Sequence, residues 1–231
     1  MKTLAAVLAG GSGSRFAADK PKQFVQLGGR PVLWHSVDTF EHCCAIDAVV
    51  IVSHPDHFDE IKQLADGFGW RKLVGILPGG NTRSASSESA LQFAQAHGFE
   101  RILLHDAARP LIDNDTVLRL CDALDTADAA IAAVPVIDTI SVSADGCTVD
   151  HTPARETLWS IQTPQAFTVS VLAEAYARFD SDPGAVATDD GGVIRRYMPN
   201  VPVLLVEGNR KAQKLTYPED LPILEALLSV D

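Results

Sequence analysis

The sequence predicts an α/β fold in which a mainly parallel, twisted sheet carries helices on both faces. Strand-like apolar runs alternate along the chain with helix-like segments of roughly 10 to 15 residues, which is the pattern of βαβ units. The strand-like runs are almost continuously apolar, as in AVVIV at 48–52. Such runs are typical of parallel strands that are buried on both faces, whereas half-exposed strands alternate.

The first part of the chain supplies most of this alternation. Pro31 suits a first helical position, Asp56 is available to cap the next helix, and Gly98 stands where left-handed helix caps sit. The expected strands are Thr3–Leu8, Ala48–Val52, Lys72–Leu77, Arg101–His105 and Ala129–Val134. The expected helices are Pro31–Phe40, Asp56–Phe68, Asn81–His97 and Asn114–Leu124.

The pattern changes after this region. Thr139–Val142 and Thr148–His151 flank a turn at Asp145 and Gly146, and they predict a β-hairpin with polar faces. Because such a hairpin is too exposed to belong to a core, we expect an arm, approximately at 137–157, that packs on another subunit. The remaining expected elements are strands at Leu158–Thr163 and Val203–Val206 and helices at Val169–Phe179, Asp189–Tyr197 and Pro218–Leu228. Neither a linker nor a repeat divides the sequence, so residues 1–231 are expected to form one domain.

Composition excludes several classes of partner. The 231 residues are 46% hydrophobic and 21% charged, and 19 Lys and Arg against 30 Asp and Glu give a net charge of −11. No basic stripe is available to neutralise nucleic-acid phosphates, and no apolar run approaches the roughly 20 residues of a membrane helix. The cysteines lack metal-ligand spacing, so we expect reduced thiols and a cytoplasmic location. They are Cys43, Cys44, Cys121 and Cys147.

The loop after the first strand combines glycines with cations. It reads Ala9, Gly10, Gly11, Ser12, Gly13, Ser14 and Arg15, and Lys22 follows shortly after. Ligands of open α/β sheets bind at the carboxyl ends of strands, where glycines let backbone N–H groups approach phosphates. Phe16 stands at the third glycine position of GxGxxG and no GK[ST] follows, so neither a dinucleotide fingerprint nor a P-loop is present. The spacing GxGxR…PKQ resembles the signature of nucleotidyltransferases. The resemblance implies that Arg15 and Lys22 meet a triphosphate.

A second cluster follows the strand that ends at Leu77. Gly79 and Gly80 lead into Asn81, Arg83 and Ser86, at the start of an expected helix. Glycines at such a junction allow close approach of a ligand. Asn81 or the neighbouring Thr82 could equally serve as the N-cap of the helix, and the two roles are compatible.

A third cluster, HDAARP, ends the strand Arg101–His105. Asp106 is well placed there to bind Mg²⁺, which prefers carboxylate and phosphate oxygens. Ala107 follows it. Arg109 could face a substrate phosphate or form a salt bridge.

Short polar groups also end the later apolar segments, and their order along the chain resembles that of the 2-C-methyl-D-erythritol 4-phosphate cytidylyltransferases. These groups are Asp138-Thr139, Arg155, Gln162-Thr163-Pro164-Gln165, Thr188-Asp189-Asp190 and Lys214. The resemblance covers nearly the whole chain. It implies a Rossmann-like three-layer αβα sandwich and an enzyme that joins CTP to a polyol phosphate and releases pyrophosphate, in non-mevalonate isoprenoid synthesis, with Mg²⁺ or alternatively Mn²⁺.

The resemblance further implies a role for each matching residue. Arg15 and Lys22 would stabilise the α-phosphorus and the departing pyrophosphate, and Arg155 and Lys214 would hold the acceptor phosphate for attack. Residues implied around the nucleotide are Ala9, Gly10, Gly11, Ser12, Gly13, Ser14, Gly79, Gly80, Asn81, Arg83, Ser86, Asp106 and Ala107. Residues implied around the acceptor are Arg109, Asp138, Thr139, Thr163 and Thr188. Because Arg155 adjoins the expected arm, the resemblance implies a homodimer whose arm helps to complete the site.

Some positions depart from the family pattern and keep alternatives open. The first loop begins LAGG, as it also does in ribitol 5-phosphate cytidylyltransferases, and Gly191 and Gly192 follow Asp190 where the family has an alanine. The pair Leu158-Trp159 favours the methylerythritol enzymes. The alternatives from other classes are a non-catalytic CTP-binding module and an NAD-dependent oxidoreductase. The oxidoreductase is disfavoured because no acidic residue ends the second strand.

Overall fold

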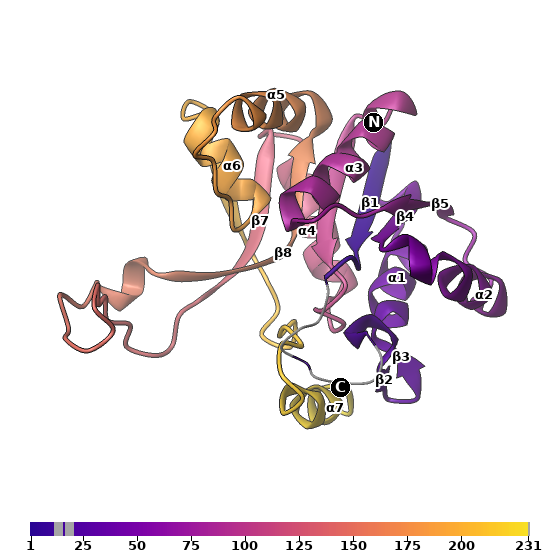
Figure 1. Ribbon diagram of the computed structural model, residues 1–231, viewed down its shortest axis with the longest axis horizontal. Coiled ribbons are helices and arrows are strands. Elements are labelled where there is room, and N and C mark those ends of the chain that lie inside the picture. The colour runs from indigo at the N-terminus through magenta and orange to yellow at the C-terminus, as the bar shows by residue number, and fades with distance from the viewer. Residues whose placement is uncertain (12–15, 17–20, 231) are drawn as a thin grey trace.

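The computed structural model describes residues 1–11, 16 and 21–230, and these residues form a seven-stranded sheet between two layers of helices (Figure 1). The sheet order is β5-β4-β1-β6-β8-β7-β9. The strands are β1 (Thr3–Leu8), β4 (Ala48–Ser53), β5 (Leu73–Pro78), β6 (Arg101–Asp106), β7 (Ala129–Pro135), β8 (Trp159–Thr168) and β9 (Val203–Glu207). The α-helices are α1 (Val32–His42), α2 (Phe58–Phe68), α3 (Arg83–Ala96), α4 (Asn114–Ala123), α5 (Val169–Asp180), α6 (Asp190–Tyr197) and α7 (Asp220–Leu228).

The sheet is mainly parallel, as predicted. β1 pairs in parallel with β4 and β6, β4 with β5, and β7 with β9. β8 is the exception, because it runs antiparallel to both β6 and β7. It also extends to Thr168, beyond the predicted end at Thr163, since its second half fills the space between those two strands.

The two faces of the sheet are buried beneath different helices. Alternate residues of β1 enter different cores: Val7 packs with α1, α2 and α4, whereas Leu8 packs with α3, α5 and α6. Because successive side chains of a strand point to opposite faces, burial on both faces requires every residue of β1 to be apolar or small. The continuous apolar runs in the sequence therefore correctly indicated a covered sheet.

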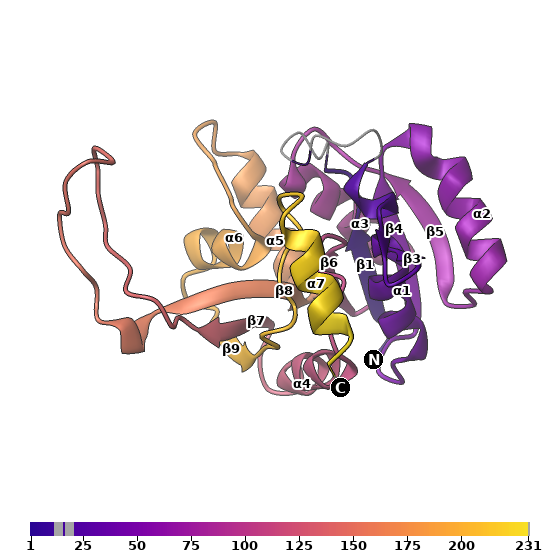
Figure 2. The same cartoon turned by 90° about the horizontal axis from the view of Figure 1, so that it is seen from below.

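The C-terminal helix α7 completes a third, smaller apolar cluster (Figure 2). Leu215 and Leu224 pack there against Phe16, Leu27 and Val32. Leu27 belongs to a small antiparallel ribbon, β2 (Gln26–Leu27) and β3 (Arg30–Pro31), which follows the short 3-10 helix η1 (Lys22–Phe24). This cluster fixes the segment after Lys22 against the segment after Lys214.

The segment between β7 and β8 projects from the rest of the chain as an arm (Figures 1 and 2). The predicted hairpin is present in reduced form, since one antiparallel bridge, between Val142 and His151, joins the described residues of its two limbs. The turn is present: the Asp145 carboxylate accepts hydrogen bonds from the backbone N–H groups of Cys147 and Thr148 at 2.8 and 2.7 Å. Ile137 and Val149 are 65% and 67% exposed. The arm projects away from the sheet and its helices among the described residues, and a two-stranded ribbon by itself is only marginally stable.

Other predicted elements are confirmed with small shifts at their ends. Asp56 lies in the 3-10 helix η2 (Pro55–His57), so the helix predicted from Asp56 begins at Phe58. The last helix begins at Asp220 rather than Pro218, because the Asp220 carboxylate accepts hydrogen bonds from the N–H groups of Thr216 and Tyr217. Within the described part of the chain, no helix has the length and apolar character needed to cross a membrane.

Leu224→Ala tests the docking of α7. The side chain of Leu224 is fully buried, whereas that of its neighbour Ile223 is 49% exposed. We expect Leu224→Ala to lower the free energy of unfolding by about 2–5 kcal/mol, because it opens a cavity in the small cluster. The matched control Ile223→Ala should change it by no more than about 0.5 kcal/mol. Urea denaturation of both variants provides the measurement, and equal losses would contradict the packing described.

Candidate functional site

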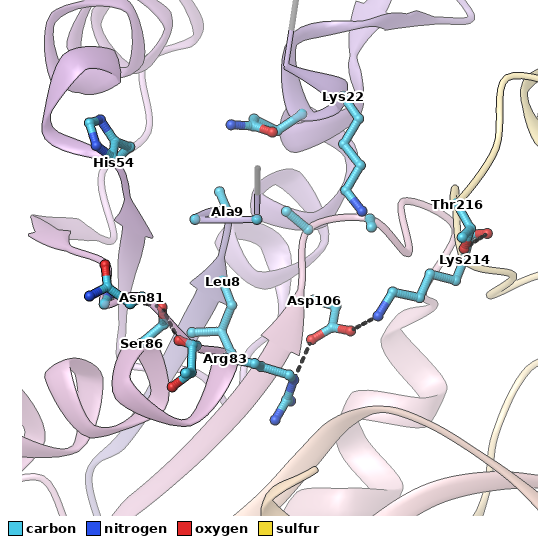
Figure 3. A pocket seen from close by; sticks show the side chains of 17 residues that line it. Leu8, Ala9, Lys22, His54, Asn81, Arg83, Ser86, Asp106, Lys214 and Thr216 are labelled. Carbon is cyan, nitrogen blue, oxygen red and sulfur yellow. Dashed lines mark hydrogen bonds and ion pairs between the residues drawn. The ribbon is translucent and has the colours of Figure 1, made fainter. Parts of the chain in front are cut away.

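A cavity of about 530 Å³ opens at the carboxyl ends of β1, β4, β5 and β6 (Figure 3). It lies where the strand order reverses, since the chain places β4 and β5 on one side of β1 and then returns to place β6 on the other. Ligands of open α/β sheets bind at such a switch point. The predicted site residues that line it are Ala9, Gly10, Gly11, Lys22, Gly80, Asn81, Arg83, Ser86, Asp106, Ala107 and Lys214. The predicted residues Ser12, Gly13, Ser14 and Arg15 lie outside the described residues.

Close packing of glycines shapes one wall. A Cβ atom on Gly79 would lie 3.6 Å from the Cα atom of Gly10 and 3.3 Å from Ser86 Oγ. The loops after β1 and β5 therefore meet across the end of β4, to which both donate backbone hydrogen bonds. A Cβ atom on Gly80 would collide with Ala85. The glycines that the sequence placed here are needed for this approach, and they leave the cavity open.

Thr82, rather than Asn81, caps α3. The hydroxyl of Thr82 accepts a hydrogen bond from the N–H of Ala85 at 3.0 Å. Asn81 is thereby left on the cavity wall (Figure 3). Ser86 holds the loop in shape, since its hydroxyl donates to the carbonyl of Thr82 and accepts from the N–H of Gly80. Thr82 therefore has the N-cap role and Asn81 has the position that faces the cavity. The two roles predicted for this cluster are compatible because they belong to different residues.

Asp106 stands at the centre of a network of ion pairs (Figure 3). Its two carboxylate oxygens accept hydrogen bonds from Arg83 Nε at 3.0 Å and from Lys214 Nζ at 2.6 Å. Burial alone would raise the pKa of Asp106, but the two cations outweigh it and hold that pKa well below the usual range. Asp106 is therefore ionised near neutral pH.

Arg83 extends the network to α6. Its Nη1 atom lies 2.7 Å from the carboxylate of Asp190, which is fully buried and also accepts a hydrogen bond from the hydroxyl of Tyr176 at 2.6 Å. Arg83, Lys214, Asp106 and Asp190 together carry no net charge. Removal of Arg83 would leave the buried carboxylate of Asp190 without its cationic partner, which is strongly destabilising.

The glycines after Asp190 fit a tight space between α6 and β7. A Cβ atom on Gly191 would lie 3.2 Å from Ile131 Cγ2, closer than most side chains tolerate. The backbone N–H groups of Asp190 and Gly191 both donate to the side-chain oxygen of Gln165, at 3.1 and 2.9 Å. This departure from the family pattern therefore has a packing reason.

Arg109 fastens the segment that carries Lys214. Its guanidinium donates to the carbonyls of Ala212 at 2.8 Å and Ile161 at 3.4 Å, and the N–H of Leu215 donates to the carbonyl of Ala108 at 2.7 Å. Lys22 Nζ reaches the carbonyl of Leu215 at 3.5 Å. Arg109 is not among the described residues that line the cavity, and its predicted contact with a substrate stays a prediction.

His105 and Thr163 lie beneath the cavity. His105 is completely buried against the edge of Phe40, with ring centroids 5.6 Å apart. Burial lowers the pKa of His105 to about 4. Its Nδ1 atom is 3.0 Å from the hydroxyl of Thr163, which is itself buried.

The remaining predicted acceptor residues lie apart from the cavity lining. Asp138, Thr139 and Arg155 are exposed residues of the arm, and Arg155 Nη1 donates to the carbonyl of Ile137 at 3.1 Å. Arg155 begins the 3-10 helix η3 (Arg155–Thr157). Thr188 is exposed in the segment before α6. The predicted acceptor group is therefore divided between the cavity, where Lys214 lies, and the arm.

Sequence reasoning missed some residues of the cavity. His54, which follows β4, and Thr216 line the cavity (Figure 3). Gln23 lines it as well. The position of His54 in the sequence could have indicated its place in the cavity, because it follows a predicted strand. The carboxyl ends of parallel strands lie at the same edge of a sheet, which is where ligands bind.

The donor set of the cavity suits a cation that is bound mainly by phosphate oxygens. No cluster of three or more His, Cys, Asp or Glu side chains with metal-site geometry occurs among the residues that the structure describes. Asp106 supplies one ionised carboxylate. Mg²⁺ is commonly held by one or two carboxylates together with substrate phosphates, so this single donor fits such an ion.

Glycine loops at the switch point of a parallel sheet, with lysines around a buried carboxylate, define a nucleotide-binding α/β protein of the nucleotidyltransferase class. A family profile described as 2-C-methyl-D-erythritol 4-phosphate cytidylyltransferase matches residues 3–230, and the chain belongs to this family.

Similar proteins share the whole length of the chain. A 2-C-methyl-D-erythritol 4-phosphate cytidylyltransferase from Thermobifida fusca is 40% identical, covering 98% of this chain and 93% of that protein. One from Lachnospira eligens is 37% identical, covering 95% and 96%. The crystal structure of a 4-diphosphocytidyl-2C-methyl-D-erythritol synthase from Anaerococcus prevotii superposes with a TM-score of 0.86 at 29% identity, covering 98% of both chains.

The buried imidazole of His105 predicts a loss of stability in mild acid. Its pKa falls from 6.5 to about 4 on folding. Between these pH values the unfolded chain binds a proton that the folded chain does not, so the free energy of unfolding decreases as the pH falls. The contribution approaches about 3 kcal/mol near pH 4. Denaturant unfolding between pH 7 and pH 4.5 should show a steeper decrease in the natural protein than in His105→Gln. Equal slopes would contradict the assignment to His105.

Proposed function

We propose that this protein transfers the cytidylyl group of CTP to 2-C-methyl-D-erythritol 4-phosphate, in non-mevalonate isoprenoid synthesis. The products are 4-diphosphocytidyl-2-C-methyl-D-erythritol and pyrophosphate. The observation that carries the proposal is the convergence of family-pattern residues from four separate loops on one cavity: Gly10, Asn81, Asp106 and Lys214. The full-length family match supports the choice of substrates.

The reaction needs alignment and charge neutralisation more than proton transfer. An oxygen of the acceptor phosphate, already ionised near pH 7, forms a bond to the α-phosphorus of CTP. The bond between that phosphorus and the oxygen bridging to the β-phosphate breaks, and pyrophosphate leaves with the electron pair. Lys22 faces the cavity (Figure 3) and stabilises the charge that develops on the leaving group, together with Arg15. Lys214 holds the attacking phosphate.

The nucleoside end of CTP occupies the glycine-lined wall. Asn81 offers both a donor and an acceptor to the edge of the cytosine, and Gly80 and Ser86 close around it. The absence of a side chain at Gly10, which lines the cavity, leaves room for the ring. Arg83 supports this wall through its ion pairs rather than through the base.

Asp106, with the triphosphate, is the group that would hold Mg²⁺. Such an ion draws charge from the phosphates. Because Arg83 and Lys214 keep the Asp106 carboxylate ionised, it is ready to accept a cation without first losing a proton. Mn²⁺ prefers the same oxygen donors and is the alternative ion.

The protein acts as a homodimer in this proposal, with each arm reaching the cavity of the partner. The arm carries Asp138, Thr139 and Arg155, and its apolar side chains at Ile137 and Val149 are exposed. A partner subunit would cover that surface and would join Arg155 to Lys214 on one acceptor phosphate.

A cytoplasmic location accords with the free thiols of the chain and with two phosphorylated substrates.

Pyrophosphate release tests the proposed reaction. With CTP and Mg²⁺, we expect turnover with 2-C-methyl-D-erythritol 4-phosphate and at least roughly 10²-fold less in Lys22→Ala, the scale of losing one transition-state donor. Lys62→Ala, a distant exposed lysine, is the control. Turnover with ribitol 5-phosphate alone would keep the chemistry and change the acceptor. CTP binding without turnover on either would indicate a non-catalytic module.

Mixing two inactive variants tests whether the site is shared between subunits. Lys22→Ala and Arg155→Ala should each be impaired, and Arg155→Ala should mainly raise the KM for the acceptor phosphate. If Arg155 acts on the cavity of the partner, one site of each mixed dimer retains both residues. Co-refolding equal amounts should then restore about a quarter of the natural activity, because half of the dimers are mixed and half of their sites are intact. No restoration would place Arg155 in the cavity of its own chain.

A further inference from the structure

Gln23 differs from the other buried glutamines of the described chain in having no hydrogen-bond partner. Gln23, Gln162 and Gln165 are 4%, 5% and 0% exposed. Gln162 and Gln165 use both ends of their amides, in hydrogen bonds to Asn209 and to the beginning of α6. The Gln23 amide forms no hydrogen bond with any residue that the structure describes. Burial of an amide without a partner costs free energy, and nearly all buried polar groups have one. The amide therefore suits a ligand.

The 3-10 helix η1 directs Gln23 into the cavity. Such a helix has three residues per turn, so three successive side chains point in three directions. Lys22 extends to the carbonyl of Leu215 (Figure 3), and Phe24 is buried in the core with residues of α1. Gln23 takes the third direction and lines the cavity. Its amide thus diverges from the side on which Lys22 approaches the segment of Lys214.

The chemistry of an amide limits the group that it can bind here. Gln23 offers two N–H donors and one carbonyl acceptor. Phosphate oxygens near neutral pH only accept, and Lys22 serves them in the proposed function. The edge of the cytosine lies on the glycine-lined wall, at Asn81, in the same proposal. A hydroxyl both donates and accepts. The ribose, which joins the base to the triphosphate, therefore carries the groups that match the amide.

We propose that Gln23 is a nucleotide-binding residue whose amide forms a hydrogen bond with a ribose hydroxyl of the nucleoside triphosphate. The contact contributes to the choice of a ribonucleotide over a deoxyribonucleotide. It acts on the nucleotide and not on the acceptor phosphate. In the free protein the unpartnered amide is a cost, and binding of the nucleotide removes it. The inference deepens the proposed function and rests on it only for the identity of the nucleotide.

Calorimetry with CTP and Mg²⁺, in the absence of the acceptor, tests the contact. Gln23→Met keeps the length of the side chain but removes both ends of the amide. We expect it to weaken CTP binding by about fivefold, the scale of one hydrogen bond between uncharged groups. The control Gln26→Met, at an exposed position of β2, should bind CTP like the natural protein. Equal affinities of Gln23→Met and the natural protein would overturn the inference.

Titrations with CTP analogues that lack the 2′ or the 3′ hydroxyl identify the group that is contacted. At least one analogue should bind the natural protein more weakly than CTP does. Gln23→Met should reduce that deficit by about fivefold, because the amide that recognised the hydroxyl is gone. A deficit of the same size in both proteins would refute the contact, even if Gln23→Met weakened the binding of CTP itself.

Thermal unfolding without ligand separates binding from a structural role. Because the Gln23 amide has no partner in the described chain, its replacement by an apolar side chain removes a desolvation cost. The Tm of ligand-free Gln23→Met should therefore equal or exceed that of the natural protein. A decrease of more than about 3 °C, the scale of 1 kcal/mol in a chain of this size, would assign Gln23 to the fold and overturn the inference. Gln23-dependent binding of CTP without pyrophosphate release would count against the proposed function alone.

Discussion

The pairing of Asp106 with two cations is the interaction on which the site depends. Arg83 comes from the start of α3 and Lys214 from the segment before α7, so one carboxylate joins three parts of the chain that lie far apart in the sequence. Asp190 repeats the arrangement on the far side of Arg83. Such charges tolerate burial only because each has a partner of opposite sign at hydrogen-bond distance. The position of α6 relative to α3 is therefore coupled electrostatically to the cavity.

The glutamines of the QTPQ segment show that motif residues need not touch a ligand. Gln165 receives the N–H groups of Asp190 and Gly191 and donates to Asp189 at 2.8 Å. Gln162 donates to the carbonyl of Asn209 at 2.8 Å and accepts from its N–H at 3.2 Å. Each buried amide is satisfied by a neighbouring segment, Gln162 by its main chain and Gln165 by its main chain and the Asp189 carboxylate. The two glutamines fasten β8 to the beginning of α6 and to the end of β9, which keeps Asp190 in reach of Arg83.

The sequence predicted those features that depend on local pattern. The bounds of β1 were predicted without error. A short apolar run between a charged terminus and a glycine-rich loop has few alternative secondary structures. The cavity edge was also predictable, since polar groups follow four strands. The residues of the ion pair between Arg83 and Asp190 are 107 positions apart, and those of the pair between Lys214 and Asp106 are 108 apart. No local sequence pattern could therefore predict either pair. The antiparallel course of β8 and the lack of a ladder in the arm likewise depend on tertiary contacts, which propensity does not encode.

Of the two cations predicted to hold the acceptor phosphate, Lys214 lies in the cavity and Arg155 lies on the arm. This separation limits how two subunits could assemble into a complete site. Lys214 is held by Asp106 and by the neighbouring contacts of Leu215, so its position belongs to the core of the chain. Among the described residues, Arg155 is held by the arm itself, through its hydrogen bond to the carbonyl of Ile137. A phosphate cannot be aligned for in-line attack by two cations unless their separation is fixed. In the proposed dimer that separation is set by the packing of the arm on the partner, so loss of the interface would remove alignment of the acceptor while leaving the CTP wall intact. Binding of CTP and transfer to the acceptor would then respond differently to dilution of the protein.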